Sequence, residues 1–178
     1  MRLAKKKDRP IDLDEKDRDI LRALQENCKV PYKEMGRNLG FVASTIHARV
    51  KRMEEQGVIK QFIALVDPAK LDYHVNAILG LSVDPTKIEE VAREICEFPA
   101  VKLVASSTGN HDLLVHILVT DNARLGELIL KIKSINGVLQ GAGNIHISIF
   151  TRVFKDSHFV EPFTDGETTP EHEQDETH

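Results

Sequence analysis

The residues best placed to do chemistry lie in one short basic stretch of the chain, GFVASTIHARVKRMEEQGVI, residues 40–59. If this stretch is a helix of about 100° per residue, one side is an apolar seam made of Ala43, Ile46, Val50 and Met53. The opposite side carries mainly short, polar and basic side chains: Ser44, Ala48, Lys51 and Glu55, flanked by Thr45, His47 and Arg52, with Arg49 near the boundary. A helix with short side chains near its N-terminal end can enter the major groove of DNA.

The side chains on that polar face divide into two groups by what they can do at a duplex. Ser44 and His47 can hydrogen-bond to base edges, and Ala48 can contact a thymine methyl group. The three basic residues are better placed to neutralise phosphates, which supplies affinity and register. An ordinary amphipathic helix with solvated charges would show a similar pattern. The turn at Gly40, the short helix before it and the break at Gly57 together favour DNA binding.

Two further helices are expected immediately before this stretch. In IDLDEKDRDILRALQENC, leucine and isoleucine recur at helical spacing, and Asp12 or Asp14 can cap the N-terminus. In VPYKEMGRNLG, Pro31 is typical of a helix start and Gly40 of a helix end. Three short helices, the last two joined through Gly40, predict a helix-turn-helix domain (winged-helix-like) over residues 12–60.

The pattern changes after the third helix. A β-favouring run followed by an Asp-Pro turn predicts a strand and linker over residues 58–73. From residue 74 onward, strand-like and helix-like runs alternate in the order β-α-β-β-α-β, which is that of a ferredoxin-like sandwich. The second of these helices is expected to start at a cap on Asp121 or Asn122, and Gly141 and Gly143 to mark a bulge in the last strand. The fold class is therefore expected to be α+β.

Charge is distributed unevenly along the chain. Residues 1–60 hold 15 Lys and Arg against 10 Asp and Glu, whereas residues 61–178 hold 9 against 18. A mildly basic N-terminal part on an acidic remainder indicates a surface that faces a polyanion, although solvated charge alone produces such a split too. The expected order is a basic flexible arm (1–11), the helix-turn-helix (12–60), a hinge strand and linker (61–73), the ferredoxin-like domain (74–155) and a disordered acidic tail (156–178).

Composition argues against several classes of protein. A hydrophobic fraction of 41% and a charged fraction of 29% are ordinary for a globular chain, and no apolar run approaches the length of a bilayer span. The N-terminal MRLAKKKDRP lacks the apolar block of a secretory signal, so a cytoplasmic location is expected. Cys28 and Cys96 fit neither a disulfide framework nor a zinc site. With no catalytic set or phosphate loop apparent, no catalytic residue, metal or cofactor is expected.

Taken in order, these motifs resemble the Lrp/AsnC family of transcription regulators. The similar segments are LDEKDRDIL at the entry to the first helix, GFVASTIHARVKRMEEQGVIKQFIALVDPAKLDY as recognition helix and hinge strand, and TGNHDLLVHI as a loop and strand. The resemblance covers roughly residues 11–155. It implies a DNA-binding regulator whose C-terminal domain, called a RAM domain, packs sheet to sheet in dimers. It also implies assembly of dimers into octamers and binding of an amino-acid effector at a contact between dimers.

The resemblance further implies which residues bind DNA and effector. The recognition-helix positions are Ser44, Thr45, His47, Arg49, Lys51 and Arg52, and the effector-loop positions are Thr108, Gly109, Asn110, His111 and Asp112. Gly109 can adopt a positive φ or offer its N–H to a ligand carboxylate, and Asp112 offers a charge to an α-ammonium group. The alternative is a plain hairpin turn in which Asp112 accepts a backbone hydrogen bond. Val42 stands where the family often has a serine cap, so a cap at Ser44 would shorten the recognition helix.

Three functions fit these features to different degrees. A sequence-specific regulator whose assembly or DNA affinity responds to a small ligand, an amino acid, is favoured, with double-stranded DNA as its partner. An architectural protein that coats DNA is disfavoured by the modest positive charge of residues 1–60, although multivalency offsets this. The third is an enzyme like the siroheme-decarboxylase branch, which has a Tyr-and-His stretch in this domain. Here VKLVASSTGNHDLLVHI has no Tyr and only His111 and His116, so no enzyme is expected.

Overall fold

A computed structural model of the chain describes residues 11–141 and 143–160, and these residues form two compact units. One unit comprises the N-terminal part up to Ala64 together with the segment that begins at Ser157. The other unit runs from Leu65 to Asp156. Each unit has its own hydrophobic core.

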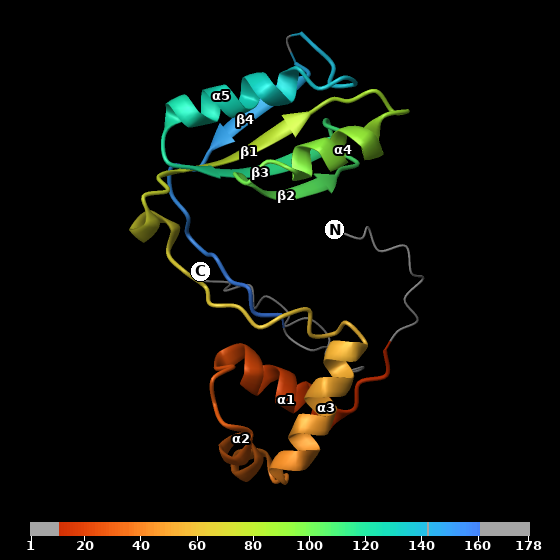
Figure 1. The fold of residues 1–178 in the computed structure, drawn as a ribbon, viewed down its shortest axis with the longest axis vertical. Helices are drawn as coiled ribbons and strands as arrows, with labels where there is room; N and C mark the ends of the chain where they lie inside the picture. The colour runs from red at the N-terminus through yellow and green to blue at the C-terminus, as the bar shows by residue number, and fades with distance from the viewer. Residues whose placement is uncertain (1–10, 142, 161–178) are drawn as a thin grey trace, which may run out of the picture. The chain divides into compact units, whose positions relative to one another are not determined.

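Three helices make up the N-terminal unit: α1 (Glu15–Glu26), α2 (Tyr32–Leu39) and α3 (Ala43–Glu55) (Figure 1). Asp14 caps α1 in a reciprocal capping box with Asp17, so the second of the two expected caps is the one used. The core consists of apolar residues at helical spacing: Ile20, Leu24, Met35, Ile46, Val50 and Met53. The apolar seam predicted for the third helix therefore faces this core, and the helix-turn-helix prediction is confirmed.

The β-favouring segment that follows α3 forms no strand within this chain. Residues 60–67 have no regular structure, and a short 3-10 turn, η1 (Pro68–Leu71), follows with Asp67 as its cap. The prediction of a formed hinge strand was therefore wrong for the single chain. A strand requires a neighbour with which to exchange backbone hydrogen bonds, and β-propensity alone does not supply one. Large apolar side chains of this segment are exposed: Phe62, Ile63, Leu65 and Val66.

The C-terminal unit contains β1 (Val75–Leu81), α4 (Ile88–Cys96), β2 (Val101–Ser106), β3 (Leu113–Val119), α5 (Asn122–Lys133) and β4 (Ile145–Ile149). The strands form one antiparallel sheet in the order β2-β3-β1-β4. This is the spatial order of the predicted ferredoxin-like sandwich, so the α+β fold class is confirmed. Asp121 caps α5 by accepting a hydrogen bond from the backbone N–H of Arg124.

Alternation along the two central strands decides which face of the sheet packs on the core, and the one departure is Gly80 of β1, which is buried beneath the ring of His111. Every second residue of β1 from Val75 and of β3 from Leu113 is buried, and α4 and α5 pack on that face (Figure 1). The intervening residues of both strands lie on the opposite face of the sheet. One face of the sheet therefore packs into the hydrophobic core of the C-terminal unit.

The glycines that precede the last strand differ from their prediction. Gly141 and Gly143 have φ values of 113° and 94° and precede β4, which begins at Ile145. They form a turn that the left-handed backbone of glycine permits, so the expected bulge at these residues was wrong. The irregularity of the sheet instead falls in β2, where the register against β3 shifts between Val101 and Leu103.

The predictions for the two ends of the chain fall mainly on residues 1–10 and 161–178, which lie outside the described residues. At the described end of the C-terminal segment, the side chain of Gln25 in α1 exchanges two hydrogen bonds with the backbone of Val160. The Gln25 amide donates to the Val160 carbonyl at 2.9 Å, and the Val160 N–H donates back at 2.7 Å. In the part of the chain that the structure describes, the helices fall short of the length and apolar character that crossing a membrane requires.

Candidate DNA-binding surface and effector loop

Two glycines build the turn between α2 and α3. Gly40 ends α2 in the left-handed conformation with φ 73°, as predicted. Gly36 lies against the chain just after this turn, where a Cβ would come within 2.4 Å of the carbonyl oxygen of Phe41. The Phe41 N–H donates to the Gly36 carbonyl at 2.8 Å. The sequence pattern indicates Gly40 but not Gly36, because a glycine inside a helix gives no turn signal.

The N-terminus of α3 has no side-chain cap. Val42 occupies the cap position with φ −82° and ψ 147°, and the helix still begins at Ala43. The prediction that a cap at Ser44 shortens the recognition helix was therefore wrong. The first turn of α3 also lacks acidic residues. Its backbone N–H groups and the positive end of the helix dipole together suit the approach of a phosphate.

The outward face of α3 presents the residues expected to read DNA. Ser44, His47, Ala48 and Lys51 are exposed, whereas Thr45 is half-buried. A hollow of about 420 Å³ in this surface is lined by Ser44, Thr45, Ala48, Arg49 and Arg52. The ring of His47 meets the ring of Tyr32 from α2 edge-on, with the ring centroids 6.0 Å apart. Short side chains thus line the centre of this face, and an aromatic ring of α2 limits the freedom of His47.

Arg49 and Arg52 pair with two carboxylates at the start of α1. The Arg49 Nη1 atom lies 2.7 Å from Asp14 Oδ2 and 2.8 Å from Asp17 Oδ1. Arg52 Nη2 donates to the other oxygen of Asp17. The Asp17 side chain is completely buried, while the side chains of Arg49 and Arg52 are 23% and 44% exposed. These ion pairs orient α3 on α1. The two arginines therefore have a structural role in addition to any contact they make with a phosphate.

The electrostatics of this cluster follow from its geometry. The hydrogen bond from Arg49, together with the backbone N–H of Asp17, lowers the pKa of Asp14 to about 2. In return, the hydrogen bonds to Asp14 and Asp17 raise the pKa of Arg49. Lys51 differs, because its side chain is 67% exposed and its ion pair with Glu55 is long, at 3.9 Å. Of the three basic residues on α3, Lys51 is the one most available to a phosphate.

The role of Asp17 was not foreseen from the sequence. The signal that exists is local: Asp14 and Asp17 stand three residues apart at a helix start, which is the spacing of a capping box. That spacing predicts the cap but not the arginine partners, which lie 32 and 35 residues further along the chain.

The predicted effector loop joins β2 to β3. Thr108, Gly109 and Asn110 are exposed at its tip, and the Gly109 N–H donates to Ser107 Oγ at 3.1 Å. Gly109 is not among the residues with positive φ. Asp112 Oδ2 accepts a hydrogen bond from the backbone N–H of Val83 at 2.8 Å. This is the bonding expected of the plain-turn alternative, in which the carboxylate fastens the loop to the end of β1.

His111 packs differently from the loop tip. Its ring lies over Gly80 of β1, where a Cβ would come within 2.3 Å of the ring, and its centroid is 4.7 Å from that of His146 in β4. Among the described residues, the buried Nδ1 atom of His111 has no hydrogen-bond partner. The five predicted loop residues therefore split into three exposed tip residues and two, His111 and Asp112, that pack on the sheet. Over residues 11–141 and 143–160, no three His, Cys, Asp or Glu side chains gather closely enough to hold a metal ion.

Comparisons with known proteins agree with this two-unit architecture. Residues 13–60 match the winged helix-turn-helix DNA-binding family, and residues 76–158 match the Lrp/AsnC ligand binding domain. An uncharacterised HTH-type transcriptional regulator of Pyrococcus horikoshii is 36% identical over 151 residues, which are 82% of this chain and 96% of the relative.

Solved structures show the same fold. AsnC of E. coli superposes with a TM-score of 0.78 at 23% identity, covering 85% of this chain and all of that one. The L-Met complex of a transcriptional regulator from Neisseria meningitidis superposes with a TM-score of 0.75 at 25% identity, covering 83% of this chain and 95% of that one. With a DNA-binding helix-turn-helix unit followed by a ligand-binding unit, the chain is a transcriptional regulator that belongs to the Lrp/AsnC family.

Proposed function

We propose that this protein is a cytoplasmic, sequence-specific DNA-binding regulator whose assembly or DNA affinity changes when it binds an amino acid. The observation that carries the proposal is the outward face of α3, where exposed Ser44, His47 and Ala48 lie over a buried apolar seam. Such a face can approach base edges closely. Regulation rather than catalysis is its proposed role.

The proposed division of labour on α3 follows from how each side chain is held. His47 and Ser44 read base edges, and the exposed Lys51 neutralises a phosphate. Arg49 is held by Asp14 and Asp17, so its main role is to set the angle of α3 on α1. Arg52 is more exposed and shares Asp17 with Arg49. It therefore has two proposed roles, an ion pair with Asp17 and a contact with a phosphate of the DNA backbone.

In the proposed dimer, the RAM sheets of two copies pack together, and each copy binds one half-site of a pseudo-palindromic DNA sequence. Leu103 and Phe150 are large apolar side chains that are 54% and 44% exposed in the single chain. Burying such side chains against a second copy is favourable. In a dimer of this kind, two α3 helices enter successive major grooves, and dimers assemble further into octamers or related forms.

The effector proposal rests on the ligand-binding family match and on the neighbouring regulator whose structure is an L-Met complex. The tip residues Thr108, Gly109 and Asn110 are exposed, so a ligand or a second dimer can reach them. If an amino acid bound there changes DNA affinity by some factor, DNA must change the affinity for that amino acid by the same factor.

The proposal is tested by fluorescence anisotropy on DNA from the protein's own upstream region and on a shuffled duplex. Both duplexes are titrated at several salt concentrations, with and without pooled amino acids. Preference for the native duplex that shifts with amino acids is the expected result. Equal and steeply salt-dependent binding to both duplexes would favour an architectural coat. Absence of binding at low salt would refute the DNA-binding role, and tetrapyrroles would then be tested as substrates.

Variants separate the proposed roles. His47→Ala is expected to change the preference among duplexes, whereas Lys51→Gln weakens binding to all of them and lowers the slope of log affinity against log salt by about 0.9 for each phosphate that is no longer neutralised. Lys133→Gln, an exposed lysine in the other unit, is the matched control and leaves both properties unchanged. If His47→Ala alters neither affinity nor preference, the assignment of the α3 face is wrong.

A further inference from the structure

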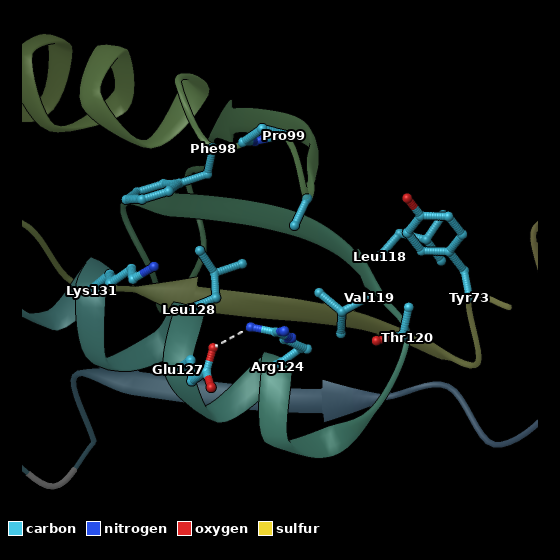
Figure 2. A pocket seen from close by; sticks show the side chains of 11 residues that line it. Tyr73, Phe98, Pro99, Leu118, Val119, Thr120, Arg124, Glu127, Leu128 and Lys131 are labelled. Atoms are coloured by element: carbon cyan, nitrogen blue, oxygen red, sulfur yellow. Dashed lines mark hydrogen bonds and ion pairs between the residues drawn. The ribbon is translucent and has the colours of Figure 1, made fainter.

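A cavity of about 360 Å³ opens in the C-terminal unit at the end of β3 (Figure 2). Strand β3 runs from Leu113, next to the predicted effector loop, to Val119, which lines the cavity. The cavity and the loop therefore lie at opposite ends of the same strand. We propose that the cavity is a second ligand site, distinct from the loop, that takes an apolar α-amino acid in its zwitterionic form.

Unequal strand lengths produce the cavity. The first residue of β2, Val101, pairs with Ile117 of β3, and Ala100 accepts a hydrogen bond from the Leu118 N–H at 2.9 Å. Strand β3 continues to Val119, past the start of β2. A hollow remains between this overhanging end, the turn at residues 98–100 and helix α5. The register shift at the start of β2 lies beside it, and such irregularities recur next to binding sites.

The interior of the cavity is apolar. Val119 and Leu128 are 6% and 7% exposed and belong to the hydrophobic core, so this part of the cavity wall is firmly packed. Phe98 stands at one end of the cavity and Leu118 at the other (Figure 2). A branched or aromatic side chain can bury its surface here at about 25 cal/mol for each Å² removed from water. The volume lies toward the small end of the range for ligand sites, which suits an amino acid.

Charged groups line one side of the same cavity. Arg124, Glu127 and Lys131 follow each other at spacings of three and four residues on α5, so they share one face of the helix. Arg124 Nη1 lies 3.0 Å from Glu127 Oε2, and the two side chains are 66% and 57% exposed. An ion pair so exposed contributes little stability and exchanges its partners readily.

A zwitterion is complementary to this arrangement of charges. Its carboxylate can replace Glu127 on the guanidinium of Arg124, and its ammonium group can then bind the released Glu127 carboxylate. Lys131 adds a second cation for the carboxylate. Thr120 donates its hydroxyl proton to Asp121 Oδ2 at 2.9 Å, so its oxygen can accept a hydrogen bond from the ammonium group. Glycine has no apolar side chain to bury in the cavity. An apolar carboxylate such as 3-phenylpropionate has no ammonium group to bind Glu127.

The test is isothermal titration calorimetry of the full-length protein with L-phenylalanine, L-leucine, glycine and 3-phenylpropionate. We expect L-phenylalanine and L-leucine to bind at least about ten-fold more tightly than glycine. Arg124→Gln is expected to weaken L-phenylalanine binding about ten-fold or more. Glu127→Gln should weaken binding of L-phenylalanine but not of 3-phenylpropionate, which a purely structural role of Glu127 would not produce. The matched control Arg93→Gln replaces an exposed arginine of α4 and leaves all affinities unchanged.

Comparing a loop variant with Arg124→Gln separates this site from the effector loop proposed above. The double variant Thr108→Ala, Asn110→Ala alters the loop tip and should retain the part of L-phenylalanine binding that Arg124→Gln removes. Loss of binding in the loop variant but not in Arg124→Gln would overturn the cavity site while leaving an amino-acid-responsive loop intact. Absence of binding by both L-phenylalanine and L-leucine would also overturn it. DNA affinity that ignores amino acids, together with binding that needs Arg124, would refute the proposed regulation and retain the cavity site.

Discussion

Replacing Asp17 by asparagine tests whether the buried carboxylate holds the recognition helix in place. The change keeps the size of the side chain but removes the charge that faces both Arg49 and Arg52. Each charge-assisted hydrogen bond contributes about 1.5–3 kcal/mol, and breaking a fully buried pair costs about 3–5 kcal/mol. The arginines are 23% and 44% exposed, so water compensates in part, and asparagine can still accept one hydrogen bond. We therefore expect a loss of about 2–3 kcal/mol in the free energy of opening of this unit.

Because the chain has two units, the loss is best measured by amide hydrogen exchange with mass spectrometry, which reports the opening of each segment separately. Peptides from α1 and α3 should exchange about 30- to 150-fold faster in Asp17→Asn, and a peptide from β3 should be unchanged. Asp19→Asn is the matched control, since Asp19 pairs with Arg22 at 3.1 Å at a more exposed position, where such a pair contributes about 1 kcal/mol or less. If Asp17→Asn speeds exchange no more than Asp19→Asn does, the buried carboxylate does not hold α3.

Three further predictions concern the same unit. The lowered pKa of Asp14, about 2 instead of 3.8, means that its carboxylate stabilises the fold above pH 3.8 and that this contribution is lost as the pH falls through about 2. Exchange in α1 should therefore accelerate between pH 4 and pH 2 beyond its intrinsic pH dependence, and Arg49→Gln should flatten this rise. Gly36→Ala should destabilise the helix-turn-helix in urea unfolding by about 1–3 kcal/mol, because its Cβ would meet the Phe41 carbonyl. The control Gly126→Ala, where a Cβ meets nothing within 4 Å, should stabilise α5 by about 0.5–1 kcal/mol. Val42→Ser should stabilise α3 by about 1 kcal/mol in the same assay, since residue 42 already has the backbone of an N-cap; an unchanged midpoint would show that α3 needs no cap.

Features that depend on short stretches of chain could be predicted from the sequence. The sequence limited each cap to two neighbouring candidates, Asp12 or Asp14 for α1 and Asp121 or Asn122 for α5, and the buried side of α3 follows from the spacing around Ile46. The order of strands and helices in the C-terminal unit follows from the alternation of their apolar residues. The sheet order then needed only the general rule for a βαββαβ chain.

Features that depend on distant residues could not be predicted. The hinge segment has the composition of a strand, but its pairing requires a neighbour that residues 11–141 and 143–160 do not provide. The need for glycine at positions 36 and 80 arises from Phe41 and His111, which pack against them after folding. Similarly, the cavity at the end of β3 depends on where β2 begins, and strand ends are poorly defined by sequence patterns.

The acid–arginine cluster also bears on the proposed discrimination between DNA sequences. Residues 1–60 have five more basic than acidic residues, but Asp14 and Asp17 neutralise much of the charge of Arg49 and Arg52 where α3 would meet DNA. Non-specific affinity grows with the number of phosphates neutralised, so this pairing lowers the affinity for any duplex. The proposed hydrogen bonds from Ser44 and His47 to bases would be unaffected by this pairing. Arg52 is the more exposed of the two arginines, and Asp17 keeps its ion pair with Arg49 when Arg52 turns to a phosphate. The cluster thus favours a high ratio of specific to non-specific binding, which a regulator needs and a DNA coat does not.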